Sequence, residues 1–276
     1  MNKKTNLQYH PFHLVSVSPW PFFISISLFT TVLGLLLIFK NVENITFFFF
    51  FIFYCGFLSI VLVAFQWWRD IIREGLLEGS HTLKVQQGLK LGFILFVVSE
   101  IMLFVSFFWA FFHASLSPNI EIGCIWPPKG LNVLDPWGVP FLNTLILLFS
   151  GATITWAHQL ILVGNFYQTA YALAITINLA LFFTGLQICE YIDASFDISD
   201  GIYGSVFFML TGLHGSHVLV GTIFITVCLI RHLYKHFTRT HHIGLESAIW
   251  YWHFVDVVWL FLFIFVYWWG KKKKKI

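Results

Sequence analysis

A long apolar stretch with one carboxylate near its middle sets the strongest limit on what this chain can fold into. Residues 89–112 contain two ionisable side chains, Lys90 near the start and Glu100. A helix rises about 1.5 Å per residue, so about 20 apolar residues span the hydrocarbon core of a membrane. The stretch therefore predicts a transmembrane helix with Glu100 near mid-depth. A charged carboxylate there costs about 2.5–3.5 kcal/mol, so we expect Glu100 to face a protein interior or a wet cavity formed by other helices.

Six further apolar runs predict six more transmembrane helices. Of the 276 residues, 58% are hydrophobic and 11% are charged, whereas soluble domains average about 25% charged residues. The runs are long and do not alternate, which favours helices over a β-barrel. We expect an all-α membrane protein, one membrane domain over residues 1–276, with spans at 19–39, 45–68, 89–113, 139–163, 166–189, 202–230 and 246–269.

Basic residues in the short loops predict the orientation. With the N-terminus inside, nine Lys or Arg residues lie inside and two lie outside, which fits the positive-inside rule. The C-terminal run of lysines, residues 271–275, argues the other way. Because the first helix usually dominates, we expect an inside N-terminus and an outside C-terminus. The inside residues are Lys3, Lys4, Arg69, Arg73, Lys84, Lys90, Arg231, Lys235 and Arg239, and the outside residues are Lys40 and Lys129.

Two pairs of polar residues lie three apart inside predicted helices. His214 and His217 share one helix face, and so do His253 and Asp256. The two histidines are either half of a metal site, with His158, His253 and Glu100 as further candidate ligands, or interhelical hydrogen-bonding groups. We favour the second interpretation and predict no metal. For His253 and Asp256 we expect a structural pair.

Depth in the membrane predicts a partner for Glu100. The third and sixth predicted helices run in opposite directions. Glu100 lies near the middle of the third helix, and His214 and His217 lie near the middle of the sixth. A buried polar group without a partner costs about 1–3 kcal/mol. We therefore predict a bond from Glu100 to one of these histidines, His217 in preference, directly or through one water. The pair is either structural or a proton relay, and we favour a structural role.

Charged residues at the helix ends predict two kinds of surface. Arg69 follows Trp67 and Trp68, and Arg231 ends the sixth helix. Basic residues beside membrane aromatics attract anionic lipid headgroups, although ordinary positive-inside topology also explains them. Glu190 and the acidic residues that follow it are expected to form a solvated rim; these are Asp193, Asp197 and Asp200.

Residue chemistry alone leaves two classes open, a transporter and a subunit of an energy-converting complex. A transporter should show an internal repeat or matching broken helices, and none is evident. A redox protein should show a ligand set for haem or metal. The four cysteines lie far apart in the sequence and show no paired-Cys spacing.

Several long motifs carry a resemblance to a known family. They are SPWP (18–21), QWWRDIIRE (66–74), GLKLGFILFVVSE (88–100), FFWAFFHASLSP (107–118), WPPKG (126–130), VPFLNTLILLFSGATITWAH (139–158), ISDGIYGSVFFMLTGLHGSHVLVG (198–221) and WYWHFVDVVWLFLF (250–263). In these blocks the sequence resembles subunit III of cytochrome c oxidase in its mitochondrial form. The parts that resemble the family least are the Phe-rich second helix, the turn before the fifth helix and the lysine tail.

The resemblance implies a core subunit of complex IV, which passes electrons from cytochrome c to oxygen and pumps protons. Subunits I and II would hold haem a, haem a3 and copper, and this chain would hold no redox centre. It implies two helix groups, the first two and the last five, in a V whose cleft holds phospholipid. It also implies support of proton uptake and of the catalytic subunit's stability. Glu100 matches the family's intramembrane glutamate, and Trp67, Arg69 and Arg231 match its lipid contacts.

The same resemblance implies a place and partners. We expect the mitochondrial inner membrane, with the N-terminus in the matrix and the C-terminus in the intermembrane space. Partners would be subunits I and II, accessory subunits, other respiratory complexes and phospholipids, and no nucleic acid. A quinol oxidase subunit III, a bacterial cytochrome oxidase and a stand-alone membrane transporter are the alternatives.

Overall fold

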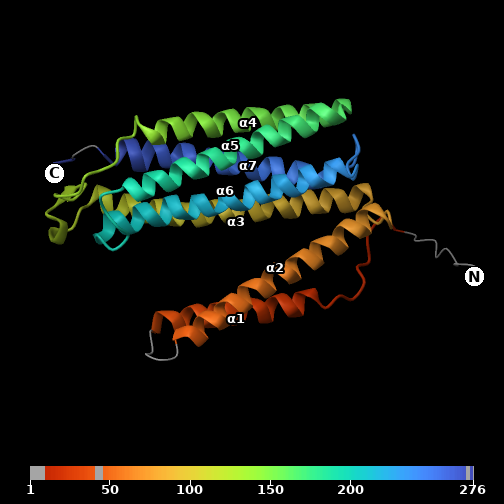
Figure 1. The fold of residues 1–276 in the computed structure, drawn as a ribbon, viewed down its shortest axis with the longest axis horizontal. Helices are drawn as coiled ribbons and strands as arrows, with labels where there is room; N and C mark the ends of the chain where they lie inside the picture. Colours follow the sequence, from red (N-terminus) through yellow and green to blue (C-terminus); the bar gives the residue numbers. More distant parts are fainter. Residues whose placement is uncertain (1–9, 41–45, 272–273, 276) are drawn as a thin grey trace, which may run out of the picture. The chain divides into compact units, whose positions relative to one another are not determined.

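Seven long helices make up most of the structure, a computed structural model that describes residues 10–40, 46–271 and 274–275 (Figure 1). All seven are long and apolar enough to cross a membrane, which confirms the predicted all-α membrane fold. Their bounds are α1 Trp20–Lys40, α2 Thr46–Leu76, α3 Leu83–Leu116, α4 Val139–Val163, α5 Phe166–Asp193, α6 Gly201–Leu233 and α7 Ile243–Phe261. A π-helical turn, η2 (Leu262–Trp269), continues α7.

The chain divides into two compact units, with the boundary inside α3. Unit 1 is Met1–Leu89 and unit 2 is Lys90–Ile276. Unit 1 contains α1, α2 and residues 83–89 of α3, and unit 2 contains the rest of α3 with α4–α7. The family resemblance implies a similar grouping, with the boundary before the third helix. Each unit is described by itself below.

Unit 1 is a hairpin of α1 and α2 that pack closely because two glycines leave no side chain at their crossing. A Cβ atom on Gly34 would lie 2.6 Å from the backbone nitrogen of Phe53, and one on Gly56 would lie 2.6 Å from that of Thr31. Small residues let helix backbones approach in membranes, where no hydrophobic force between helices exists. The indole of Trp20 also donates a hydrogen bond to Asp70, at 2.8 Å.

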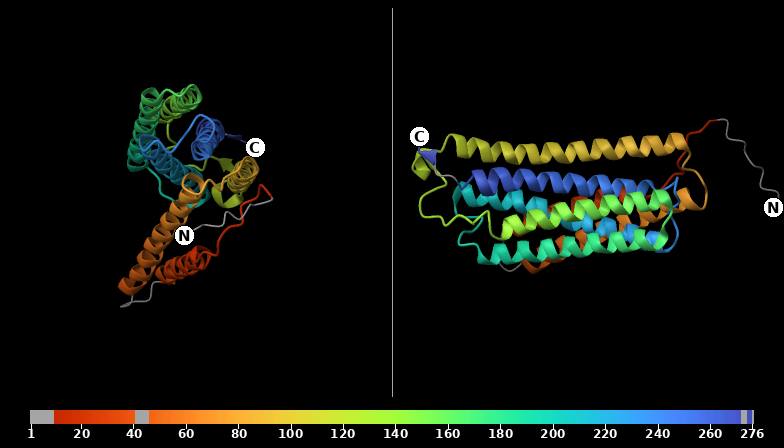
Figure 2. Two further views of the ribbon diagram at one scale, coloured as in Figure 1. Left: turned by 90° about the vertical axis from the view of Figure 1, so that its right-hand side faces the viewer. Right: turned by 90° about the horizontal axis from the view of Figure 1, so that it is seen from above.

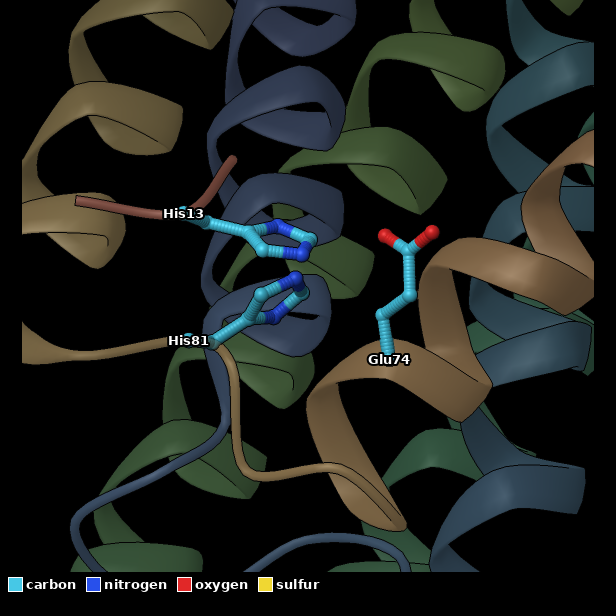
Figure 3. A group of neighbouring side chains, drawn as sticks. All are labelled: His13, Glu74 and His81. Atoms are coloured by element: carbon cyan, nitrogen blue, oxygen red, sulfur yellow. The ribbon is translucent and has the colours of Figure 1, made fainter. Parts of the chain in front are cut away.

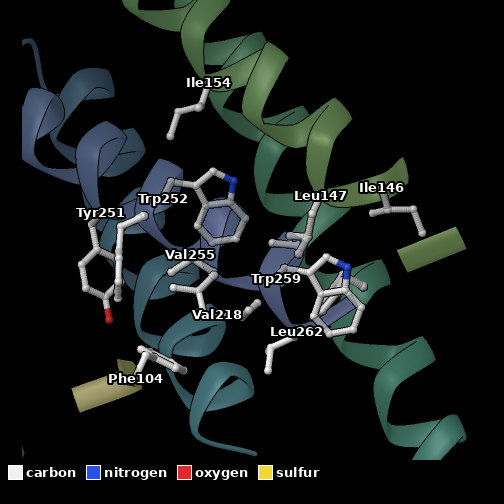
Figure 4. Close-up of a cluster of buried hydrophobic side chains, with 14 of the residues drawn as sticks. Phe104, Ile146, Leu147, Ile154, Val218, Tyr251, Trp252, Val255, Trp259 and Leu262 are labelled. Carbon is white, nitrogen blue, oxygen red and sulfur yellow. The ribbon is translucent and has the colours of Figure 1, made fainter. Parts of the chain in front are cut away.

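Unit 2 contains residues 90–116 of α3 and the helices α4–α7, which run side by side (Figures 1 and 2). Its core is a cluster of large side chains around α7, where Trp252 and Trp259 are at most 1% exposed (Figure 4). Their indole nitrogens donate to hydroxyls of α4, to Ser150 and to Thr144, at 2.9 Å each. Buried tryptophans need such acceptors, so a polar stripe on α4 sets how α7 packs.

The segment between α3 and α4 folds against one end of unit 2. It contains a short 3₁₀ turn, η1 (Ile120–Ile122), and the two-residue strand β1 (Ile125–Trp126), which pairs antiparallel with β2 (Lys274–Lys275). Trp126 is 1% exposed and packs edge-on against Phe111 of α3, with ring centroids 5.6 Å apart. The Lys271 ammonium also donates to Asp135 at 2.7 Å. The C-terminal end of the described chain is thereby joined to this segment.

Candidate functional site

Glu100 and His217 meet inside unit 2. The His217 Nε2 atom lies 2.7 Å from the Glu100 Oε2 atom, and its Nδ1 atom lies 2.8 Å from the carbonyl oxygen of Leu213. Because a carbonyl can only accept, Nδ1 carries a hydrogen. The short contact at Nε2 then needs one further proton, held either by the carboxyl group or by the imidazole ring. In both forms the pair is neutral as a whole, which lowers the penalty for placing it in a membrane.

Aromatic rings surround this pair. The His217 ring centroid lies 5.1 Å from that of Phe104 on α3 and 6.0 Å from that of Phe254 on α7. Tyr251 stacks on the same imidazole at 6.2 Å. The side chains of His217 and Glu100 keep 10% and 22% of their surface exposed. The rings thus exclude most solvent from a proton-sharing pair that joins α3 to α6.

His214 has a different partner from His217. Its Nε2 atom lies 3.2 Å from the carbonyl oxygen of Val255, and the residue is 1% exposed. The ring of Trp259 lies 5.2 Å away, centroid to centroid. His214 therefore links α6 to α7 through the backbone. Within the described ranges, neither His214 nor His217 belongs to a group of three close metal-binding atoms.

His253 and Asp256 lie on α7 where it passes α4. The His253 Nε2 atom is 3.1 Å from the hydroxyl of Thr155, and its Nδ1 atom is 3.7 Å from Asp256 Oδ2. A Cβ atom on Gly151 would lie 2.5 Å from Asp256 Oδ2, so the carboxylate packs on the α4 backbone. The arrangement holds α7 against α4, which is compatible with a structural role for the pair.

Glu190 is not part of a solvated rim, so that prediction was wrong for this residue. It is 5% exposed, and its carboxylate lies beside the hydroxyl of Tyr267. The other three acidic residues of the group are exposed. The helix spacing explains the error: Phe183, Gln187 and Glu190 follow one another at intervals of four and three, and all three are buried.

The sequence analysis missed a buried polar chain that passes through Gln187, one helical turn before Glu190. The amide of Asn143 donates to Gln187 Oε1 at 3.3 Å, and the amide of Gln187 lies 3.4 Å from the hydroxyl of Tyr267. All three residues are at most 6% exposed. The sequence did contain an indication of this chain, because Asn143 and Gln187 are isolated amides within apolar runs. A polar group at membrane depth needs a partner on another helix.

The residues predicted to contact lipid lie at helix ends. In unit 1, Trp67 is half-buried, and the exposed Arg69 side chain pairs with Asp70 at 3.0 Å. In unit 2, the Arg231 guanidinium lies 4.5 Å from the centre of the Phe237 ring, and its Nε–H has no hydrogen-bond partner in the described chain. Both guanidinium groups retain donors that an anionic headgroup could use.

Comparison with known proteins gives a direct match over nearly the whole chain. The family model for cytochrome c oxidase subunit III matches residues 10–271. The chain belongs to the cytochrome c oxidase subunit III family. The relative from Marchantia polymorpha, named cytochrome c oxidase subunit 3, is 58% identical over 95% of this chain and 98% of its own length. Relatives of the same name from Chondrus crispus and Drosophila melanogaster are 57% and 54% identical over 96% and 95% of this chain, and over 96% and 97% of their own lengths.

As a subunit III chain, this protein is a multi-pass membrane subunit of cytochrome c oxidase, and its partners are other subunits of that enzyme. The family membership decides against a stand-alone transporter and a quinol oxidase subunit. The geometry of Glu100 and His217 is therefore to be understood within a subunit of a larger enzyme.

Among the described residues of this subunit III chain, two groups of histidine and glutamate side chains gather closely. In unit 1 they are His13, Glu74 and His81, with the two imidazole rings beside each other and Glu74 reaching from α2 (Figure 3). In unit 2 they are His158, His242 and Glu246. The sequence analysis considered His158 as a ligand but with different partners. His242 and Glu246 were missed, although a spacing of four places them one turn apart at the start of α7.

Proposed function

We propose that this chain is the subunit of the mitochondrial inner-membrane oxidase that stabilises the catalytic subunit and supports proton uptake without a redox centre of its own. Haem a, haem a3 and copper would be held by subunits I and II, its direct partners. The observation that carries the proposal is the Glu100–His217 contact of 2.7 Å, because it forms a closed, neutral pair. The four cysteines also lie far apart in the sequence and lack the paired spacing of a copper motif.

The pair acts structurally in this proposal. It ties α3 to α6 at a depth where a lone carboxylate would be unfavourable. Glu100→Gln keeps a side-chain donor for the lone pair of His217 Nε2, while it removes the proton that the carboxyl group can exchange. In the holoenzyme, we expect Glu100→Gln to assemble and to take up protons at the wild-type rate.

The experiment compares Glu100→Gln with Glu100→Ala in the purified oxidase. Glu100→Ala leaves the histidine without its partner and should lower the thermal stability of subunit III by about 1–3 kcal/mol. Slowed proton uptake in an assembled Glu100→Gln enzyme would replace the structural role by a proton relay. Purification of the chain without haem-bearing partners would contradict the proposal as a whole.

Anionic phospholipid is the second part of the proposed function. Arg69 with Trp67, and Arg231 separately, would each hold a headgroup, since a guanidinium binds phosphate with two parallel hydrogen bonds. Replacing both arginines with alanine should reduce the phospholipid retained by the purified oxidase and shorten its active life during turnover. Unchanged lipid content in the double variant would refute this part.

The orientation completes the proposal. The N-terminus and the loop between α6 and α7 would face the matrix, and the loop before α4 would face the intermembrane space with the C-terminus. The support is the nine-to-two distribution of basic residues in the short loops. In mitoplasts with an intact inner membrane, protease should reach the lysine tail. If cleavage of the tail requires an opened inner membrane, the orientation is reversed.

A further inference from the structure

Three potential ligand side chains converge where α4 ends and α7 begins. His158 lies in the last two turns of α4, His242 immediately precedes α7, and Glu246 is one turn into α7. One ligand atom from each lies within 4.8 Å of the other two. The three residues belong to unit 2, and the proposed function uses none of them.

The His242 ring is oriented as a ligand would be. The residue is 4% exposed, and its Nδ1 atom lies 3.0 Å from the carbonyl oxygen of Thr238. That carbonyl can only accept, so Nδ1 carries the hydrogen and the Nε2 atom of a neutral ring presents its lone pair. Histidine ligands of metals usually donate their other N–H to a carbonyl or carboxylate in this way.

The lone pair of His242 faces another acceptor. Its Nε2 atom lies 3.4 Å from Glu246 Oε1 and has no hydrogen-bond partner in the described chain. The other carboxylate oxygen, Oε2, forms an ion pair with the ammonium group of Lys90 on α3. The His242 nitrogen is buried, and the Glu246 side chain keeps 16% of its surface exposed. Two acceptors that face each other in this way require a cation between them, either a proton or a metal ion.

The third side chain favours a metal ion. The ring of His158 approaches that of His242, with centroids 5.8 Å apart and planes at 64°. A second imidazole is unnecessary for a proton shared between His242 and Glu246. Two imidazole nitrogens and one carboxylate oxygen form a ligand set typical of zinc, whereas calcium and magnesium prefer oxygen ligands alone.

We propose that His158, His242 through Nε2 and Glu246 through Oε1 bind a zinc-class divalent cation. Zinc ligands lie about 2.0–2.1 Å from the metal and hence about 3.4 Å from one another, so small side-chain rotations would close the set. Because His158 is only partly buried, water can supply the fourth ligand. Lys90 holds the outer carboxylate oxygen, and the ion ties the end of α4 to the start of α7.

The experiment measures zinc in the purified holoenzyme. The oxidase is stripped with a chelator, dialysed against zinc chloride, and assayed for zinc per haem a by mass spectrometry.

We expect His242→Gln and Glu246→Gln each to lose one zinc ion per oxidase relative to the wild type. His241→Gln, one residue away and outside the group, is the matched control and should lose none. His13→Gln alters the other group, in unit 1, and leaves His158, His242 and Glu246 intact. It should therefore lose no zinc from the site at the start of α7, which distinguishes the two groups. Equal zinc content in the wild type and both site variants would overturn the proposal.

A second measurement needs no variant, in case the substitutions prevent assembly. Diethylpyrocarbonate modifies unprotonated imidazole nitrogens, and His158 is accessible enough to react. Zinc at equimolar concentration should reduce modification of His158 at least tenfold and leave His241 unchanged. If zinc does not protect His158, the cation between His242 and Glu246 is a proton and the metal site is excluded.

Discussion

In unit 1 the two helices approach each other at glycines, whereas in unit 2 the helices are joined by hydrogen bonds between buried side chains. The described buried residues of α1 are Ser27 and Gly34, and Trp20 and Asp70 form a hydrogen bond between α1 and α2. In unit 2, α4 alone buries Asn143, Thr144, Ser150 and Thr153.

This difference between the two units shows which contacts fix a single arrangement of helices in a membrane subunit. Apolar side chains can face lipid as well as they face each other, so they do not fix one arrangement of helices. A tryptophan or histidine that needs an acceptor does fix one, because the alternative is an unsatisfied group in hydrocarbon. We therefore expect unit 2 to depend on single polar contacts and unit 1 to depend on close backbone approach.

The largest expected effect is in the unit 2 core. Trp252→Ala removes a fully buried side chain and its bond to Ser150, which should destabilise the subunit by about 3–5 kcal/mol. Trp68→Ala, in unit 1, removes a side chain that is 65% exposed and should change stability by at most about 0.5 kcal/mol. Thermal release of subunit III from the purified oxidase measures both. Similar release temperatures for the two variants would remove the contrast between the units.

Glycine substitutions test the close approach in unit 1. Gly34→Ala places a Cβ atom 2.6 Å from the Phe53 backbone and should cost about 1–3 kcal/mol, because the two helices must move apart. Gly185→Ala on α5 is the matched control, since nothing lies within 4 Å of its Cβ position. It should be neutral or slightly stabilising. The same thermal assay applies, and a tolerated Gly34→Ala would mean that the α1–α2 crossing is not backbone-limited.

A smaller effect is expected for the hydrogen bond in unit 1. Trp20→Phe keeps an aromatic ring but loses the indole donor to Asp70, which should cost about 1 kcal/mol. Trp68→Phe is the control for the general effect of replacing an indole. A loss as large as that of Trp252→Ala would show that unit 1 also depends on a single polar contact.

The seven helices could be predicted from the sequence because hydrophobic length is a local property. The predicted second span ended at residue 68, yet α2 continues to Leu76 through QWWRDIIRE. Length and composition predict where a chain can cross a membrane, but not where the helical hydrogen bonding ends.

The site could be predicted only in part. The Glu100–His217 approach of 2.7 Å is the geometry expected from equal depth on antiparallel helices. Depth could not separate His214 from His217, because that distinction depends on helix rotation. Glu190 was assigned to the rim because acidic residues follow it, although its spacing from Phe183 and Gln187 indicated a buried face. His242 and Glu246 lie where charged loop residues are ordinary, and their convergence with His158 depends on tertiary packing.

The smallest expected effect concerns His236, in the loop between α6 and α7 of unit 2. Partial burial, with a smaller contribution from the nearby Arg231 guanidinium, lowers the pKa of His236 below its usual 6.5. The unfolded chain therefore takes up a proton at this residue before the folded chain does. The contribution of His236 to the stability of the folded chain does not change with pH above about 6.5. Below that pH, protonation of His236 favours the unfolded chain, so the stability falls as the pH drops. His236→Asn should make the melting temperature of subunit III less sensitive to pH between 7.5 and 5.5, while His241→Asn serves as the neighbouring control. A larger pH sensitivity in His236→Asn than in the wild type would show that the folded loop favours the protonated ring, contrary to its position beside Arg231.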